Sequence, residues 1–156
     1  MDQSAFGDTP LSRCRFYRQV CDLPAVVDTP QLGRIIVKAG IVLALMMPAP
    51  LGQAVRTQLR QRHQEIGPIM SHPRSNRWSY LVRPDLPDDD RLFAEMWRIH
   101  VSVVRPGCDI ALPSPTEHCA EFRVWVEPPC DTFRPSGLAV VDAIRVVTMR
   151  RARTHA

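Results

Sequence analysis

GCDIALPSPTEHCAEFRVWVEPP, residues 107–129, is the segment from which the architecture of this chain is most readily inferred. Its side-chain pattern predicts two short strands, at Asp109–Leu112 and at 121–127, on either side of a proline-stiffened loop. In the second strand, Arg123 and Trp125 stand at alternate positions, the spacing that puts side chains on one face of a sheet. The segment therefore predicts a sheet that presents a cation near an aromatic ring.

Three upstream segments have the hydrophobic patterns of strands and a helix. Residues 33–48, GRIIVKAGIVLALMMP, have no polar face, which predicts one buried strand or two strands that turn at Ala39-Gly40. Apolar side chains recur every four residues over 50–65, the spacing of an amphipathic helix that begins at a proline. Residues 77–83, RWSYLVR, alternate as the residues of a strand do.

A second helix is predicted next, followed by a strand at 101–105. The acidic run at 88–90, DDD, lies where a helix N-terminus favours negative charge. We prefer this interpretation to a metal site because no glycine-bearing calcium loop is present. Ser136 is expected to cap a last helix. The apolar face of the second helix is assigned to Leu92, Phe93, Met96 and Trp97.

The predicted elements describe an α+β fold with a mixed or antiparallel sheet and helices packed on one face. Their order is β-α-β-α-β-β-β-α. The whole chain, residues 1–156, is expected to form one domain, because its length is ordinary for a single hydrophobic core. Residues 1–12 and 150–156 are expected to be flexible. Residues 13–20 fit either a short strand or a helical turn.

Charge and composition exclude little. The formal net charge is +4 and the isoelectric point is about 9.1, which permits a polyanionic partner. However, Lys38 is the only lysine and Asn76 the only asparagine, a bias expected of a GC-rich genome. The positions of the arginines are therefore a better guide to binding than the net charge.

Five cysteines are present without a C-x-x-C pair, so neither a disulfide framework nor a zinc ribbon is indicated. His118 and Cys119, with Cys108 and Cys130, have the ligand types of a zinc site but not its spacing, and free thiols are preferred. Adjacent residues on a strand point to opposite faces, so His118 is not expected to activate Cys119 as a nucleophile.

No sequence motif indicates a membrane segment or a cofactor. The first residues lack the pattern of a secretory signal, and the apolar run at 39–49 is shorter than the roughly 20 residues that span a bilayer. We therefore expect a cytoplasmic protein without a membrane partner. The phosphate-binding and dinucleotide-binding glycine motifs are missing, and no cofactor is expected.

Over residues 33–129, the order of elements resembles the N-terminal domain of archaeo-eukaryotic primase-polymerases, the prim-pol family. In that family a strand ends in two metal-binding acids spaced D-x-D, followed by proline and a helix. The corresponding strand here ends in LMMP at 45–48, before the helix at 50–65. The family's phosphate-contacting histidine lies in a strand context like G-R-H-L-Y-F. The matching residues, NRWSYL at 76–81, have Trp78 in its place.

The remaining match comes from ALPS at 111–114 and FRVW at 122–125, which correspond to the end of one family strand and to the aromatic strand that follows. A third family acid would fall near Val101 or Ser102 and is missing. Two-metal phosphoryl transfer needs carboxylates, and Met46 and its neighbour Met47 supply no oxygen ligands for Mg²⁺. The resemblance therefore implies a prim-pol-like scaffold without polymerase activity.

The candidate binding residues are arginines at strand positions and two nearby tryptophans. The arginines could bind phosphates, and a tryptophan could stack on a base. The alternatives are a solvated strand face and, for at least one tryptophan, a place in the core. The candidates are Arg74, Arg77, Trp78, Arg83, Arg123 and Trp125.

Three functions remain open on the sequence alone. The first is a catalytically inactive prim-pol-like domain that binds DNA, RNA or a nucleotide. The second is a regulatory module that keeps only the scaffold and uses it for a protein partner or for self-association. The third, an enzyme that uses cysteine or histidine chemistry, rests on residue types alone, so an enzymatic role is not the preferred hypothesis.

Overall fold

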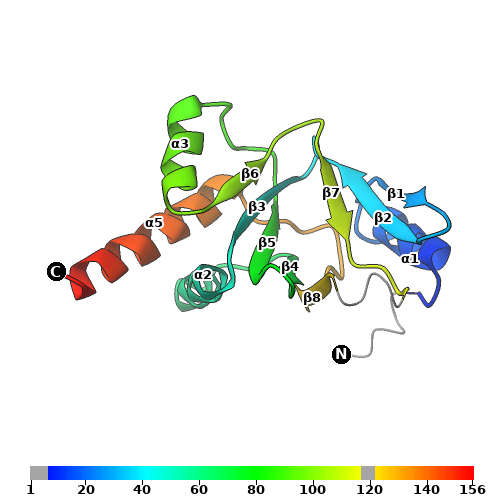
Figure 1. The fold of residues 1–156 in the computed structure, drawn as a ribbon, viewed down its shortest axis with the longest axis horizontal. Helices are drawn as coiled ribbons and strands as arrows, with labels where there is room; N and C mark the ends of the chain where they lie inside the picture. The colour runs from blue at the N-terminus through cyan, green and yellow to red at the C-terminus, as the bar shows by residue number, and fades with distance from the viewer. Residues whose placement is uncertain (1–6, 117–121) are drawn as a thin grey trace.

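The computed structural model describes residues 7–116 and 122–156, and within them the chain forms four helices and eight strands (Figure 1). This arrangement confirms the α+β class, and the order of the elements roughly follows the predicted one. The elements are α1 (Pro10–Gln19), β1 (Ala25–Thr29), β2 (Arg34–Lys38), β3 (Leu43–Pro48), α2 (Ala49–Gln61), β4 (Ile69–His72), β5 (Arg77–Val82), α3 (Asp90–Arg98), β6 (Ser102–Val104), β7 (Asp109–Leu112), β8 (Val124–Glu127) and α5 (Gly137–Thr154).

The strands form two antiparallel sheets instead of the single predicted sheet. One has the order β1-β2-β7 and the other the order β6-β3-β5-β4-β8. The division falls inside the apolar run at 33–48, because β2 ends at Lys38 and β3 begins at Leu43 after a turn around Gly40. In that turn, the Gly40 N–H donates to the Val42 carbonyl (3.0 Å). The two-strand alternative is therefore the correct one, and its two strands enter different sheets.

The helices do not all lie on one face of one sheet, which corrects the prediction. Helices α2 and α5 lie side by side against the five-stranded sheet, whereas α1 packs on β1 and β2 of the three-stranded sheet (Figure 1). Tyr17 of α1 connects the two sheets. Its hydroxyl donates to the carbonyl of Pro113, which follows β7 (2.7 Å), and accepts from Nε1 of Trp125 in β8 (3.0 Å).

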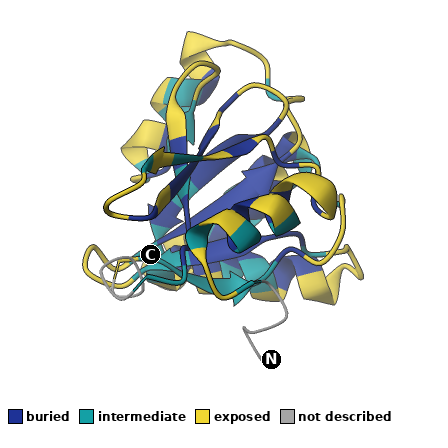
Figure 2. Cartoon of the chain, turned by 90° about the vertical axis from the view of Figure 1, so that its right-hand side faces the viewer, coloured by how far each residue is buried: buried dark blue, intermediate teal, exposed yellow. Residues whose placement is uncertain are grey.

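The core is one cluster of buried apolar side chains that runs through both sheets. Figure 2 shows the central strands largely in dark blue, the colour of buried residues. Trp78 and Tyr80 of β5 face α2, and the Tyr80 hydroxyl donates to the Gly52 carbonyl (2.6 Å). A Cβ atom at Gly52 would lie 2.9 Å from the Trp78 ring, closer than carbon atoms pack. Glycine at this position therefore lets α2 approach the sheet.

Both ends of the chain are more helical than predicted. Helix α1 begins at Pro10 and is capped by Thr9, whose side chain and that of Ser12 bond each other's backbone N–H groups as a capping box. Residues 13–20 are predicted to form either a short strand or a helical turn, and the helical alternative is the correct one, within a longer helix. Helix α5 continues to Thr154, through most of the expected flexible tail. Among the described helices, none is long and apolar enough to cross a membrane.

Candidate nucleic-acid interface

Arg77, the first residue of β5, forms the centre of the candidate site. Its Nη2 donates to the Met46 carbonyl (3.1 Å) and to the His100 carbonyl (2.8 Å). These two bonds tie the end of β3 to the turn between α3 and β6 and fix the plane of the guanidinium. Because both bonds use Nη2, the Nε and Nη1 groups are left to donate to a ligand.

His72 lies directly opposite Arg77 in the β4–β5 ladder, and its Nε2 is 2.8 Å from Ser79 Oγ. Burial, followed by the positive charges of Arg123 and Arg77, lowers the pKa of His72 to about 4. The imidazole is therefore neutral at neutral pH. The charges of Arg77 and Arg123 thus both disfavour the protonated ring.

Strand pairing explains why Arg123, distant in sequence, reaches the same place. Strand β8 pairs with β4 with Val124 opposite Ser71, so Arg123 enters the sheet beside His72. Arg74 belongs to the turn between β4 and β5, and its guanidinium lies 4.0 Å from the centre of the Phe122 ring. Arg74, Arg77 and Arg123, together with His72, are called the basic edge below.

A hollow of about 230 Å³ adjoins the basic edge and is lined by Arg77, Trp97, His100 and Ser102. The sequence pattern assigns Trp97 to the core face of its helix, but 72% of its surface is exposed. The reason is rotational: Leu92 and Met96 form the buried stripe of α3, and Trp97 lies about 100° around the helix from Met96. An exposed indole ring and a cation therefore line the same hollow.

The other candidate residues lie elsewhere. Trp78 is 8% exposed and packs beneath α2, so its ring is part of the core. Trp125 is half-buried, with its Nε1 bonded to Tyr17 and its ring edge-on to the Tyr17 ring at 6.0 Å. Arg83 follows the far end of β5 and is exposed, and its backbone N–H donates to the Pro135 carbonyl (2.9 Å). The structure thus groups Arg74, Arg77 and Arg123 and separates Arg83 from them.

The positions that the prim-pol resemblance matches to catalytic acids lie on neighbouring strands but carry no carboxylate. Met46 pairs with Ser79 of β5 and with Ser102 of β6, and Met47 is fully buried. Within the described residues, no group of three or more histidine, cysteine, aspartate or glutamate side chains could hold a metal ion. His118 and Cys119, the pair with the ligand types of a zinc site, lie outside the described residues.

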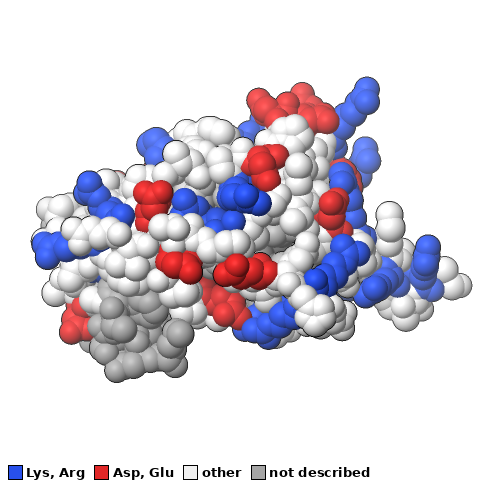
Figure 3. All heavy atoms as spheres, turned by 180° about the vertical axis from the view of Figure 1, so that it is seen from behind, with Lys and Arg blue, Asp and Glu red and all other residues white. Residues whose placement is uncertain are grey.

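Positive charge is not confined to the basic edge. Viewed from behind, basic and acidic side chains alternate over much of the surface, and basic ones predominate toward the C-terminal end of α5 (Figure 3). Arg145 in that helix is paired with Glu95, whose carboxylate accepts from its Nε at 2.7 Å. Net charge alone therefore does not locate a binding site.

Comparisons with protein-family models, curated proteins and solved structures find no match for this chain. The resemblance to prim-pol proteins therefore stays a prediction from the residues quoted above. Two features of the site are missing from the sequence-based predictions: the exposure of Trp97, and the place of His72 between two arginines in the sheet. The first has a signal, since Leu92 and Met96 already complete one apolar stripe. The second depends on strand pairing and has none.

Proposed function

We propose that this protein binds single-stranded nucleic acid at the basic edge, with phosphates at Arg77 and Arg123 and one base on Trp97. The observation that carries the proposal is the hollow lined by both Arg77 and Trp97, because it offers a guanidinium and an exposed indole in one place. Single-stranded nucleic acids are bound by this combination of backbone cations and stacking rings. A duplex keeps its bases stacked and cannot use the ring.

Local hydrogen bonding supports a role for Arg77 in binding phosphate. Its guanidinium is held by two backbone carbonyls, so little side-chain entropy is lost when a ligand binds. His72 is neutral and bonded to Ser79, so it adds no charge to repel the arginines. An anion placed beside His72 would gain from both Arg77 and Arg123.

The proposal describes binding without catalysis. Met46 and Met47 stand at the positions matched to the metal-binding acids of the prim-pol family, and Ser102 stands near the third. None of these side chains is a carboxylate ligand for Mg²⁺. A prim-pol-like scaffold that still binds single-stranded nucleic acid would have arginines at strand positions and would not need the metal-binding acids.

The test is fluorescence polarisation with labelled oligothymidine, a single-stranded RNA of the same length, and a DNA duplex. Titrations at about 50 mM and about 200 mM salt should show affinity for the single strands that falls steeply as salt rises. The duplex should bind more weakly, because it cannot stack on Trp97. Absent or salt-insensitive binding would contradict the proposal, and equal binding of the duplex would contradict the stacking role.

A protein-interaction module is the second candidate, and a separate observation favours it. Leu11 of α1 and Val26 of β1 are 72% and 48% exposed, and both line one groove. Exposed apolar patches of this kind mark interaction surfaces.

A further inference from the structure

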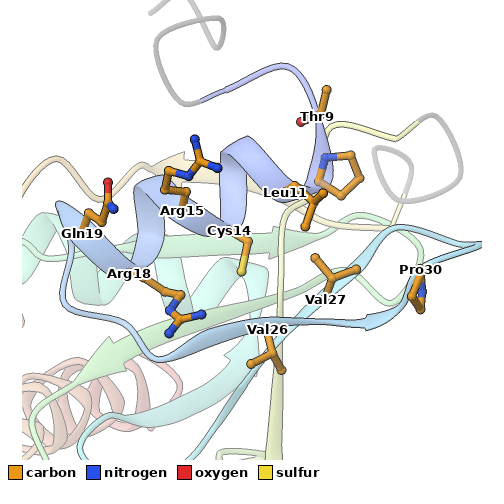
Figure 4. A pocket seen from close by; sticks show the side chains of 10 residues that line it. Thr9, Leu11, Cys14, Arg15, Arg18, Gln19, Val26, Val27 and Pro30 are labelled. Carbon is orange, nitrogen blue, oxygen red and sulfur yellow. The ribbon is translucent and has the colours of Figure 1, made fainter.

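A groove of about 1000 Å³ lies between α1 and β1 and shares no residue with the basic edge. In Figure 4, Leu11 and Cys14 project from α1 toward β1, and the side chains of Val26 and Val27 come from the strand. Leu11 and Val26 are both exposed. The floor of the groove is therefore apolar and accessible.

The groove follows the free edge of a strand. In the three-stranded sheet, β1 pairs with β2 on one side and with no described strand on the other. A second hollow of about 300 Å³ shares Arg18 and Val26 with the first and extends it to Pro24 and Ile41. The two hollows together run along β1, and an unpaired strand edge of this kind is a template for an added strand.

Backbone bonding defines which part of the edge is accessible. Ala25 is the first residue of β1, and its carbonyl already accepts a hydrogen bond from Cys14 Sγ (3.0 Å). The Thr29 carbonyl at the other end accepts from Leu32 and Gly33. The available edge therefore centres on Val27.

The positive charge of the groove favours a negatively charged binding partner. Arg15 and Arg18 line the larger hollow together with polar and apolar residues, and no acidic residue lines that hollow. The smaller hollow is lined by one acidic residue, Asp22, beside Arg18. Helix α1 carries a third arginine, Arg13, and no aspartate or glutamate. Antiparallel pairing of β1 with β1 of a second copy would bring two such helices together, which like charge disfavours.

We infer that this groove binds an extended acidic segment of a partner protein, which adds to the β1 edge as a strand. On the face of that segment turned toward α1, apolar side chains pack on Leu11 and Val27, and carboxylates at other positions of the same face meet Arg15 and Arg18. Main-chain bonds to β1 supply affinity, and the apolar floor with its basic rim supplies specificity. This inference does not depend on nucleic-acid binding, because it uses different residues.

The test is fluorescence polarisation with a short labelled peptide, blocked at both ends, that carries both valine and glutamate on one strand face, with threonine at the positions between them. It should bind, and its affinity should fall at least about tenfold in the double variant Arg15→Glu/Arg18→Glu. The matched control is Arg91→Glu, an exposed arginine on α3, which should leave the affinity unchanged. A peptide with lysine in place of glutamate should not bind.

A second peptide separates strand addition from simple charge attraction. N-methylation at alternate residues removes backbone donors without changing the side chains, and it should abolish binding. Retained affinity of the methylated peptide, equal affinity of the lysine peptide, or no binding of the glutamate–valine peptide would each overturn the inference. So would displacement of the peptide by oligothymidine, which would assign the groove to polyanions in general.

Self-association is the competing occupant and has its own readout. Sedimentation equilibrium should show a monomer across the concentration range of the binding experiment. A dimer that disappears in Val26→Lys, a substitution on the exposed face of β1, would assign the groove to a second copy and overturn the inference.

Discussion

The two faces of the five-stranded sheet use alternate residues of the same strand for different purposes. On one face, Trp78 and Tyr80 of β5 pack beneath α2 and are almost fully buried. On the other, Arg77 bonds to backbone carbonyls and Ser79 bonds to His72. The first face is closed by packing at Trp78 and Tyr80, whereas the second is buried at Ser79 and reaches the basic edge only at the end of β5, at Arg77. Substitutions one residue apart should therefore separate stability from binding.

The largest expected effect is on the packed face. Trp78→Ala should lower the free energy of unfolding by about 3–5 kcal/mol, because it removes a buried ring and leaves a cavity beneath Gly52 of α2. Urea unfolding followed by circular dichroism measures this loss. Trp78→Phe is the control and should cost less, since it keeps an aromatic ring. A loss below about 1 kcal/mol in Trp78→Ala would show that the ring is not part of the core.

Next in size is the weaker binding expected from substitutions at the basic edge. The double variant Arg77→Ala/Arg123→Ala should weaken binding of oligothymidine at least about tenfold, since two guanidinium groups no longer neutralise phosphates. The slope of log affinity against log salt should become shallower by about 0.7 for each phosphate that is no longer neutralised. Polarisation titrations at several salt concentrations measure both quantities.

Arg83→Ala is the matched control for this double variant, because Arg83 lies beyond the other end of β5 and outside the basic edge. It should leave both affinity and salt slope nearly unchanged. Equal weakening by Arg83→Ala would mean that binding depends on overall charge and not on the basic edge. Thermal unfolding of each variant checks that the fold survives the removal of the Arg77 hydrogen bonds.

Trp97→Ala should weaken binding of a single strand by about 1–3 kcal/mol, the usual contribution of one stacked base. Because the ring is mostly exposed, the free energy of unfolding should change little. Trp97→Phe should restore part of the affinity, and duplex binding should not respond to either change. Unchanged affinity in Trp97→Ala would show that no base stacks on this ring.

The smallest expected effect at neutral pH concerns His72, which influences stability only as the solution is made acidic. The pKa of its folded form is lowered to about 4, mainly by burial, whereas an unfolded histidine titrates near 6.5. Between these values the unfolded chain binds more protons, so the contribution of His72 to stability is complete above about pH 6.5 and is lost as the pH falls toward 4.

The variant His72→Gln tests this dependence, because its amide can keep a bond to Ser79 and does not titrate in this range. Urea unfolding from pH 4 to pH 7 should show a shallower loss of stability in the variant than in the natural protein. Identical profiles would mean that the folded and unfolded forms of His72 titrate alike.

Local patterns predict the elements better than their arrangement. The alternation at 77–83 and the acidic start of α3 both identify real elements, because each depends on residues close in sequence. Sheet membership depends on long-range pairing, and the apolar run at 33–48 gives no sign that β2 and β3 enter different sheets. Helix α1 is ambiguous in the sequence since its arginines interrupt the apolar stripe that contains Tyr17.

The candidate site is predictable in part for the same reason. Arg77 and Arg123 are identified by their strand positions, but their shared neighbour His72 follows only from the pairing of β4 with β5 and β8. Trp78 and Trp125 are candidate stacking rings by sequence, whereas the structure places one in the core and bonds the other to Tyr17. The exposed ring of Trp97 lies on a helix whose apolar pattern predicts that it is buried.

The most direct measurement of nucleic-acid binding at the basic edge is a nitrogen–proton correlation spectrum of the side chains, recorded as oligothymidine is added to the labelled protein. We predict that the Nε–H signals of Arg77 and Arg123 and the indole N–H of Trp97 shift together. The signals of Arg83 and of the Trp125 indole should stay in place. If the signals of Arg77, Arg123 and Trp97 do not shift, or if the Nε–H signals of all arginines shift alike, binding at this edge is contradicted.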